Sequence, residues 1–175
     1  MNGILERREC QHTALVRQTI HWEGDRRAMH KCKYGEIDAA LGDWLNRFSW
    51  DTWVTGTTYP GTPQSTTERH LRRFLRWLTP RAQRRIAWAY VVHRSPGGIW
   101  HVHALVWTQA ALSPKQVAET WRFGRPQAKA YDPRRGASHY LAQGTGSGRW
   151  WWDVSLHMPP AAPPIYGDGD ADVSA

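Results

Sequence analysis

The stretch Ala89-Tyr-Val-Val-His93-Arg-Ser-Pro-Gly-Gly-Ile-Trp-His101-Val-His103-Ala-Leu-Val-Trp107 decides which fold this sequence predicts. Two runs rich in apolar, β-branched residues flank the segment Ser95-Pro96-Gly97-Gly98, whose residue types are typical of a turn between strands. A turn centred on Gly97 would place His93 directly opposite His101 in an antiparallel pair. The sequence therefore predicts a β-hairpin near the middle of the chain.

The predicted hairpin brings three histidines to one face of a sheet. Side chains alternate between faces along a strand, so His101 and His103 point the same way, and His93 joins them from the opposite strand. Directly opposed Cβ atoms are about 4.5–5.5 Å apart, so the three imidazoles could meet at one point. Neutral imidazole is the commonest metal ligand, and three such ligands leave positions open for water or substrate. The alternative is a set of half-buried strand histidines without function. The opposite, core-facing side of the hairpin is expected to carry Val92, Val102, Ala104 and Val106.

Composition and charge indicate the class of partner. The 175-residue chain has a formal net charge of +8, with 23 Lys and Arg residues and 12 tryptophans. This charge favours a polyanionic partner, and arginines interleaved with exposed aromatic rings are typical of proteins that grip single-stranded nucleic acid. A basic surface that serves only solubility is the alternative. The sequence has no 18-residue apolar run and no signal-peptide core, and its two cysteines form no disulfide framework, so we expect a cytoplasmic protein that does not span a membrane.

Other segments alternate between helical and strand patterns. Capping residues predict helix starts at Ser65-x-x-Glu68, at Ser113 and at Asp132. The order of elements favours an α+β domain with a central antiparallel β-sheet and flanking helices. The expected helices cover residues 37–48, 65–80, 113–123 and 133–143, and the strands outside the hairpin cover residues 50–59, 127–131 and 150–156.

The chain divides into three parts by composition. Residues 1–46 are interpreted as an N-terminal extension and residues 47–157 as the main domain. Residues 158–175 are rich in proline and then in aspartate, which predicts a disordered tail.

Four residues of the N-terminal extension form a near-palindrome of metal-binding types. Thiolate and imidazole groups bind zinc tetrahedrally, so these residues could hold one structural Zn²⁺, although their spacing is not that of a standard zinc finger. The alternative is a set of ordinary polar residues. The four candidates are Cys10, His12, His30 and Cys32.

Three blocks together resemble the HUH endonucleases, most closely the rolling-circle replication initiators (Rep proteins) with a single catalytic tyrosine. His101-Val102-His103 resembles the metal motif of the family, with His93 where those initiators place a third ligand. Trp53-Val-Thr-Gly-Thr-Thr-Tyr59 is similar to the Thr-rich first strand of the family. Tyr131-Asp-Pro-Arg-Arg-Gly-Ala-Ser-His-Tyr140-Leu-Ala-Gln143 resembles the helix that bears the nucleophilic tyrosine.

The resemblance implies an RRM-like HUH fold and a reaction. Tyr140 would attack a phosphodiester of single-stranded DNA, at an origin hairpin or nick site, and leave a 5′-phosphotyrosyl bond and a free 3′-hydroxyl. His93, His101 and His103 would hold a divalent ion, Mn²⁺ or Mg²⁺, and imidazole ligands suit Mn²⁺ better. The reaction would start replication of a plasmid or phage. No helicase P-loop is present in the sequence, so a separate host or plasmid helicase would be the partner.

Gln143 departs from the initiator pattern, which has lysine three residues after the tyrosine. Glutamine can only hydrogen-bond, and this favours as an alternative a catalytically weakened relative that binds DNA without cutting it. A second alternative is a single-strand transposase of the same superfamily, because those enzymes use a glutamine of this helix as a metal ligand. Tyr140 would otherwise be a buried aromatic residue of an amphipathic helix.

Further residues are candidates for contacts to DNA. Arginines recur along the helix predicted at residues 65–80, where a merely solvated face is the alternative. The candidates are Arg69, Arg72, Arg73, Arg76, Thr55, Thr57, Arg134 and Arg135.

Overall fold

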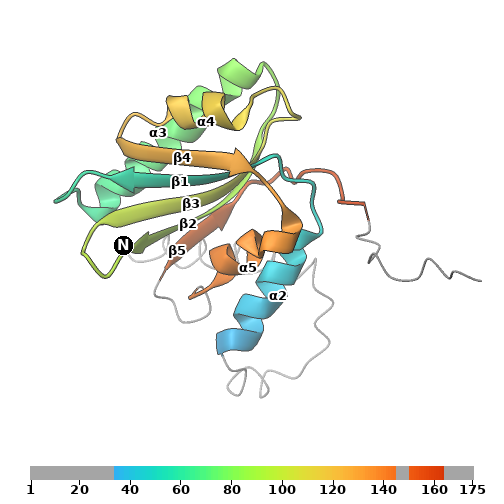
Figure 1. Ribbon diagram of the computed structural model, residues 1–175, viewed down its shortest axis with the longest axis horizontal. Helices are drawn as coiled ribbons and strands as arrows, with labels where there is room; N and C mark the ends of the chain where they lie inside the picture. Colours follow the sequence, from blue (N-terminus) through green and yellow to red (C-terminus); the bar gives the residue numbers. More distant parts are fainter. Residues whose placement is uncertain (1–33, 145–149, 164–175) are drawn as a thin grey trace, which may run out of the picture. The chain divides into compact units, whose positions relative to one another are not determined.

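A five-stranded antiparallel sheet forms the centre of the domain that the structure describes (Figure 1). The computed structural model describes residues 34–144 and 150–163. The strands lie in the order β4-β1-β3-β2-β5, and every neighbouring pair is antiparallel. This confirms the expected α+β class with flanking helices. The strands are β1 (Thr52–Thr58), β2 (Ala87–Arg94), β3 (Trp100–Trp107), β4 (Gly124–Ala130) and β5 (Trp151–Val154).

Helices cover both faces of the sheet. Helices α3 (Gln64–Ala82) and α4 (Pro114–Thr120) lie on one face, and α2 (Tyr34–Asn46) and α5 (Ala137–Ala142) lie on the other (Figure 1). The sheet therefore buries side chains on two sides, each with its own apolar cluster. Within residues 34–144 and 150–163, no helix has both the length and the apolar character needed to cross a bilayer.

The central hairpin has the predicted register. His93 of β2 pairs directly with His101 of β3, and Val91 pairs with His103. In the turn, the Gly98 N–H donates to the Ser95 carbonyl at 2.9 Å, and Gly98 has a φ of 80°, which glycine adopts without steric cost. The Ser-Pro-Gly-Gly segment thus ends both strands at the positions that the sequence indicates.

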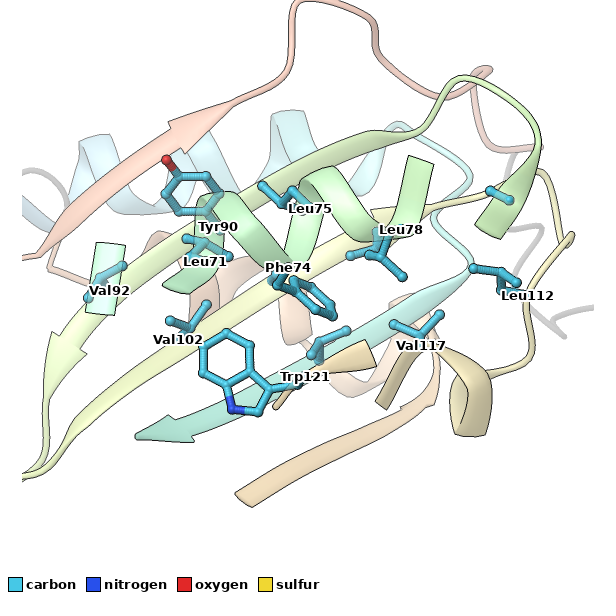
Figure 2. Packing of buried hydrophobic residues seen from close by; sticks show 14 residues of the cluster. Leu71, Phe74, Leu75, Leu78, Tyr90, Val92, Val102, Leu112, Val117 and Trp121 are labelled. Carbon is cyan, nitrogen blue, oxygen red and sulfur yellow. The ribbon is translucent and has the colours of Figure 1, made fainter. Parts of the chain in front are cut away.

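The face under α3 holds the larger apolar core. Leucine and phenylalanine side chains of α3 point onto valines of the central strands, and Trp121 closes the cluster (Figure 2). Gly56 of β1 permits this packing, because a Cβ there would come 2.8 Å from the Trp121 ring. Burial of each large aliphatic side chain stabilises the fold by about 1.5–3 kcal/mol. The α3 residues in this core are Leu71, Phe74, Leu75 and Leu78, and the expected core residues Val92, Val102, Ala104 and Val106 of the hairpin join them.

The predicted helix starts were right at Ser113 and wrong at Ser65. Ser113 and Gln116 form the reciprocal capping box that begins α4. Helix α3 begins at Gln64, directly after Pro63, and has no side-chain cap. Because the extended backbone of Pro63 already ends the preceding segment, Ser65 lies inside the first turn and its hydroxyl cannot occupy the capping position.

The helix predicted from Asp132 to Gln143 is two elements. The Asp132 carboxylate accepts a hydrogen bond from the Arg134 N–H at 3.0 Å and caps a short 3₁₀ turn, Pro133–Arg135. Gly136 then adopts a left-handed φ of 67°, which interrupts the helical hydrogen bonding before α5 begins. The prediction of one continuous helix was therefore wrong at Gly136, whose left-handed backbone conformation is free of strain for glycine.

The compact domain extends beyond both expected boundaries. Leu41 and Leu45 of α2 are buried with Leu141 of α5, so the domain includes residues that the sequence assigned to an N-terminal extension. At the other end, Phe48 forms an isolated bridge with Ala161, in the segment expected to be a disordered tail. The predicted zinc ligands, Cys10, His12, His30 and Cys32, lie outside the described residues.

Replacing Gly42 by alanine is expected to separate α2 from α5. A Cβ at Gly42 would lie 2.9 Å from the Cα of His139, and backbone cannot move away cheaply. We expect Gly42→Ala to lower the free energy of unfolding by about 1–3 kcal/mol, the usual cost of overpacking, in urea denaturation. Gly35→Ala is the matched control in the same helix, because nothing lies within 4 Å of its Cβ position. A control variant as unstable as Gly42→Ala would contradict this explanation.

Candidate metal and tyrosine site

Three histidines share the face of the sheet that α2 and α5 cover. His93 comes from β2, and His101 and His103 come from β3. Their ring centroids are 4.9 Å (His93 to His103), 5.8 Å (His93 to His101) and 6.3 Å (His101 to His103) apart. The sequence predicted this grouping correctly, because the pairing register and the alternation of side chains together determine it.

Two threonines of β1 orient two of these histidines. Thr55 Oγ1 is hydrogen-bonded to His103 Nδ1, and Thr57 Oγ1 to His101 Nδ1, both at 3.1 Å. The antiparallel register of β1 and β3 places each threonine opposite its histidine. Both threonines were expected to contact DNA, but in the structure their hydroxyls are hydrogen-bonded to the imidazoles of His103 and His101. Because each Nδ1 has a partner, the Nε2 atoms of His101 and His103 are the nitrogens that can face a ligand.

Burial keeps the histidines neutral. Burial, with a contribution from His93 and then His101, lowers the pKa of His103 to about 3. Burial and the neighbouring His101 lower the pKa of His93, and burial lowers that of His101. Neutral imidazole is the form that binds metal ions, so no proton has to leave these side chains at neutral pH before an ion binds.

The rings are stacked and do not converge on one point. Trp150, His93, His103 and Trp53 form a pile in which successive rings are inclined by 25°, 21° and 14°. Across the part of the chain that is described, no three His, Cys, Asp or Glu side chains are arranged so that they could hold a metal ion. The expected meeting of the three imidazoles at one point is therefore not found among the described residues, because His93 and His103 stack face to face between two indoles.

The chemistry of the donors nevertheless fits a metal ion. His93 Nε2 is buried and has no hydrogen-bond partner among the described residues. An unpaired buried nitrogen costs about 1–3 kcal/mol, and a bound cation would remove that cost. His93, His101 and His103 are the residues that could hold the ion.

Tyr140 of α5 lies beside this cluster. Its ring stands edge-on to His103, with ring centroids 5.0 Å apart and planes at 89°, and edge-on to Trp53 at 5.9 Å. The residue is 40% exposed, so it is not the buried aromatic residue of the alternative interpretation. A tyrosine that is packed on one side and open to solvent on the other can meet a substrate.

A second tyrosine, Tyr131, has a structural role. Its hydroxyl donates to Asn46 Oδ1 at 2.7 Å and is hydrogen-bonded to Ser138 Oγ at 2.6 Å. Burial raises its pKa, which makes ionisation still harder. This hydroxyl joins the end of β4 to α2 and α5 and so fixes the helix that carries Tyr140.

A pocket of about 280 Å³ opens beside Tyr140. Its lining combines Tyr140 and His103 with two cations, Lys129 of β4 and Arg135 of the 3₁₀ turn, and with one anion, Asp132, which forms an ion pair with Arg135. Lys129 was not among the candidate site residues that the sequence predicted. It enters this face because β4 pairs with β1 and places Lys129 opposite Trp53. Alternating polar residues in the segment Gln127–Tyr131 were the available signal, but they do not tell which strand is the neighbour.

Of the remaining predicted site residues, Arg135 lines this pocket, and Gln143, Arg134 and the α3 arginines do not. Gln143 is exposed at the end of α5 and does not line the pocket. Arg134 and Arg135 form ion pairs with Asp132, and both are largely exposed. The arginines of α3 lie over the opposite face of the sheet from Tyr140, so they do not belong to this site. They are Arg69, Arg72, Arg73 and Arg76.

Comparisons with known proteins do not assign a family. The chain matches no protein-family model, no curated protein and no solved structure.

We expect the two threonines to control metal affinity through the orientation of the imidazoles. Thr55→Val and Thr57→Val keep the β-branched shape but remove the hydroxyl, and each should weaken Mn²⁺ binding by about 10–100-fold, as loss of such outer partners does. Isothermal titration calorimetry measures this affinity. Thr52→Val is the matched control, because the Thr52 hydroxyl is buried on the other face of β1 and has no partner among the described residues. Unchanged affinity in both site variants would show that these hydroxyls do not orient metal ligands.

Proposed function

We propose that the protein nicks and rejoins single-stranded DNA through a covalent bond to Tyr140, with a divalent metal ion as cofactor. The observation that carries the proposal is the position of Tyr140, half-exposed against His103 in a pocket that also contains Lys129 and Arg135. A nucleophile, neutral metal-ligand side chains and cations for a phosphate are the groups that this reaction needs.

The proposed step is a transesterification. The Tyr140 oxygen attacks the phosphorus atom and loses its proton, the bond from phosphorus to the 3′ oxygen breaks, and that oxygen takes up a proton. The 5′ side of the strand stays on the tyrosine as a phosphotyrosyl ester. Because one phosphoester replaces another, the 3′-hydroxyl of a strand can reverse the step and restore the DNA.

Lys129 and Arg135 would hold the phosphate. Both line the pocket beside Tyr140, and a lysine or arginine pairs strongly with phosphate oxygens. Gln143 cannot supply a positive charge from α5. Lys129 supplies one from β4 instead, so the pocket contains two cations, Lys129 and Arg135, and the one carboxylate of Asp132.

The metal would be held by His93, His101 and His103. A divalent ion bound there would act as a Lewis acid that polarises the scissile phosphate and stabilises developing charge. Imidazole ligands favour Mn²⁺ over Mg²⁺, which prefers oxygen ligands. Thr55 and Thr57 would hold two of these rings with their Nε2 atoms directed to the ligand.

The biological setting follows from where such a nick is made. Nicking at one origin would initiate rolling-circle replication of a plasmid or phage, with a separate helicase to unwind the duplex. Recognition of two element ends would instead indicate a single-strand transposase.

A second candidate function is binding of DNA without cleavage. The stacked histidine rings favour it, since in this arrangement the described residues do not form a metal site. The two functions differ in one measurable product, a protein–DNA adduct that survives denaturation.

We expect Tyr140→Phe to abolish that adduct and leave DNA binding within about twofold, because only the attacking hydroxyl is lost. The assay incubates the protein with a labelled single-strand oligonucleotide library and Mn²⁺ and resolves the products on a denaturing gel. Tyr59→Phe is the matched control, since Tyr59 is a more exposed tyrosine at 65%. His101→Ala and His103→Ala should also lose the adduct. Complexes that all dissociate in detergent with the unaltered protein support the binding function, and adduct formation by Tyr140→Phe rules out this nucleophile.

Lys129→Gln is expected to remove one phosphate contact. The slope of log affinity against log salt concentration should fall in magnitude by about 0.7, the value for one phosphate on a single strand, in fluorescence anisotropy titrations. Arg47→Gln also removes one positive charge and serves as control, because Arg47 is exposed and lines neither of the two pockets. An equal slope for Lys129→Gln and the unaltered protein would remove Lys129 from the DNA contacts.

A further inference from the structure

Three aromatic rings form a stack on the side of the sheet that α3 and α4 cover, across the sheet from Tyr140. The His70 and Phe123 rings are 4.0 Å apart and inclined by 5°, and Phe123 and Trp77 are 5.5 Å apart and inclined by 14°. His70 and Trp77 come from α3, and Phe123 directly precedes β4. The stack joins two segments distant in sequence and ends on Trp77, which is only partly buried.

A pocket of about 430 Å³ lies beside Trp77. Trp77, Pro80, Arg81, Thr120 and Arg122 line it. Two guanidinium groups lie over the indole, with the Cζ atoms of Arg73 and Arg122 at 5.2 Å and 6.0 Å from its centroid. One Arg81 nitrogen donates to Thr120 Oγ1 at 3.0 Å. The other donors of Arg81 remain for an anion, because a guanidinium has five N–H groups.

Positive charge dominates this side of the molecule. Arginines recur along α3 and in the segment that follows it, whereas Glu68 is the acidic residue of α3 and Glu119 that of α4. None of the α3 arginines forms an ion pair with an acidic side chain in the described residues. A polyanion is therefore attracted to this face. The arginines are Arg69, Arg72, Arg73, Arg76, Arg81, Arg84 and Arg85.

We propose that this face is a second binding site for single-stranded nucleic acid, in which a base stacks on Trp77 and the adjacent phosphates pair with Arg81 and Arg122. A flat aromatic ring flanked by guanidinium groups is the combination that holds unpaired bases without regard to their sequence. Duplex DNA keeps its bases inside and offers this pocket only its phosphates. The site does not depend on cleavage, because it lies across the sheet from Tyr140 and uses none of the proposed catalytic residues.

The test measures binding of fluorescent dT20, U20 and a 20-base-pair duplex in EDTA, where metal-dependent cleavage cannot occur. Trp77→Ala should weaken binding of dT20 or U20 by about 5–150-fold, the range for loss of one stacked base, and change duplex binding by less than twofold. Arg122→Ala should weaken single-strand binding as well. Arg122 is exposed, so this variant tests the site even if Trp77→Ala fails to fold.

Arg84→Ala is the matched control. Arg84 is an exposed arginine of the same face that is hydrogen-bonded to Gln109 and does not line the pocket. An Arg122→Ala loss larger than the Arg84→Ala loss supports the site. Equal losses for the two arginine variants, or unchanged single-strand binding by folded Trp77→Ala, would overturn it. Neither result bears on the adduct formed by Tyr140, so the two proposals fail separately.

Discussion

The antiparallel register of β2 and β3 is the constraint on which the candidate site depends. It places His93 opposite His101, and the two-residue period of the strands adds His103 to the same face. A slip of one residue would turn the histidines into the apolar core beneath α3 and expose Val92 and Val102 instead. The buried valines therefore stabilise the same register that brings the imidazoles together, and the chemistry of one face rests on the packing of the other.

The second requirement is the attachment of α5. This helix has only six residues, too few to be stable alone, so its position comes from its neighbours. Leu141 packs with the α2 leucines, and the Tyr131 hydroxyl joins Asn46 to Ser138. These contacts hold Tyr140 against His103 while leaving it 40% exposed. A short helix thus holds Tyr140 in a defined place because α2, which lies far away in sequence, supports it.

The sheet separates two kinds of surface. On one face, neutral histidines and a partly exposed tyrosine lie beside a pocket with two cations and one carboxylate, and the proposed phosphodiester transfer rests on this combination. On the other face, arginines and stacked rings surround Trp77 and offer charge and stacking without a nucleophile. A single strand that contacts both surfaces would be bound at the Trp77 pocket and positioned for the proposed reaction at Tyr140. The stacked histidine rings also have a physical origin, since Trp150 and Trp53 pack against the two ends of the pile.

The sequence by itself determined the features that depend on near neighbours along the chain. These are the hairpin and its register, the α+β class, the Ser113 cap and the shared face of the three histidines, since turn chemistry and alternation act over a few residues. Only the tertiary structure decided the partners across strands. In the structure, Thr55 and Thr57 are hydrogen-bonded to His103 and His101. The pairing of β4 with β1 brings Lys129 close to Tyr140, and the α3 arginines lie on the other side of the sheet. Strand order and helix placement depend on how all the apolar side chains are buried together, and a pattern within a few neighbouring residues does not contain that information.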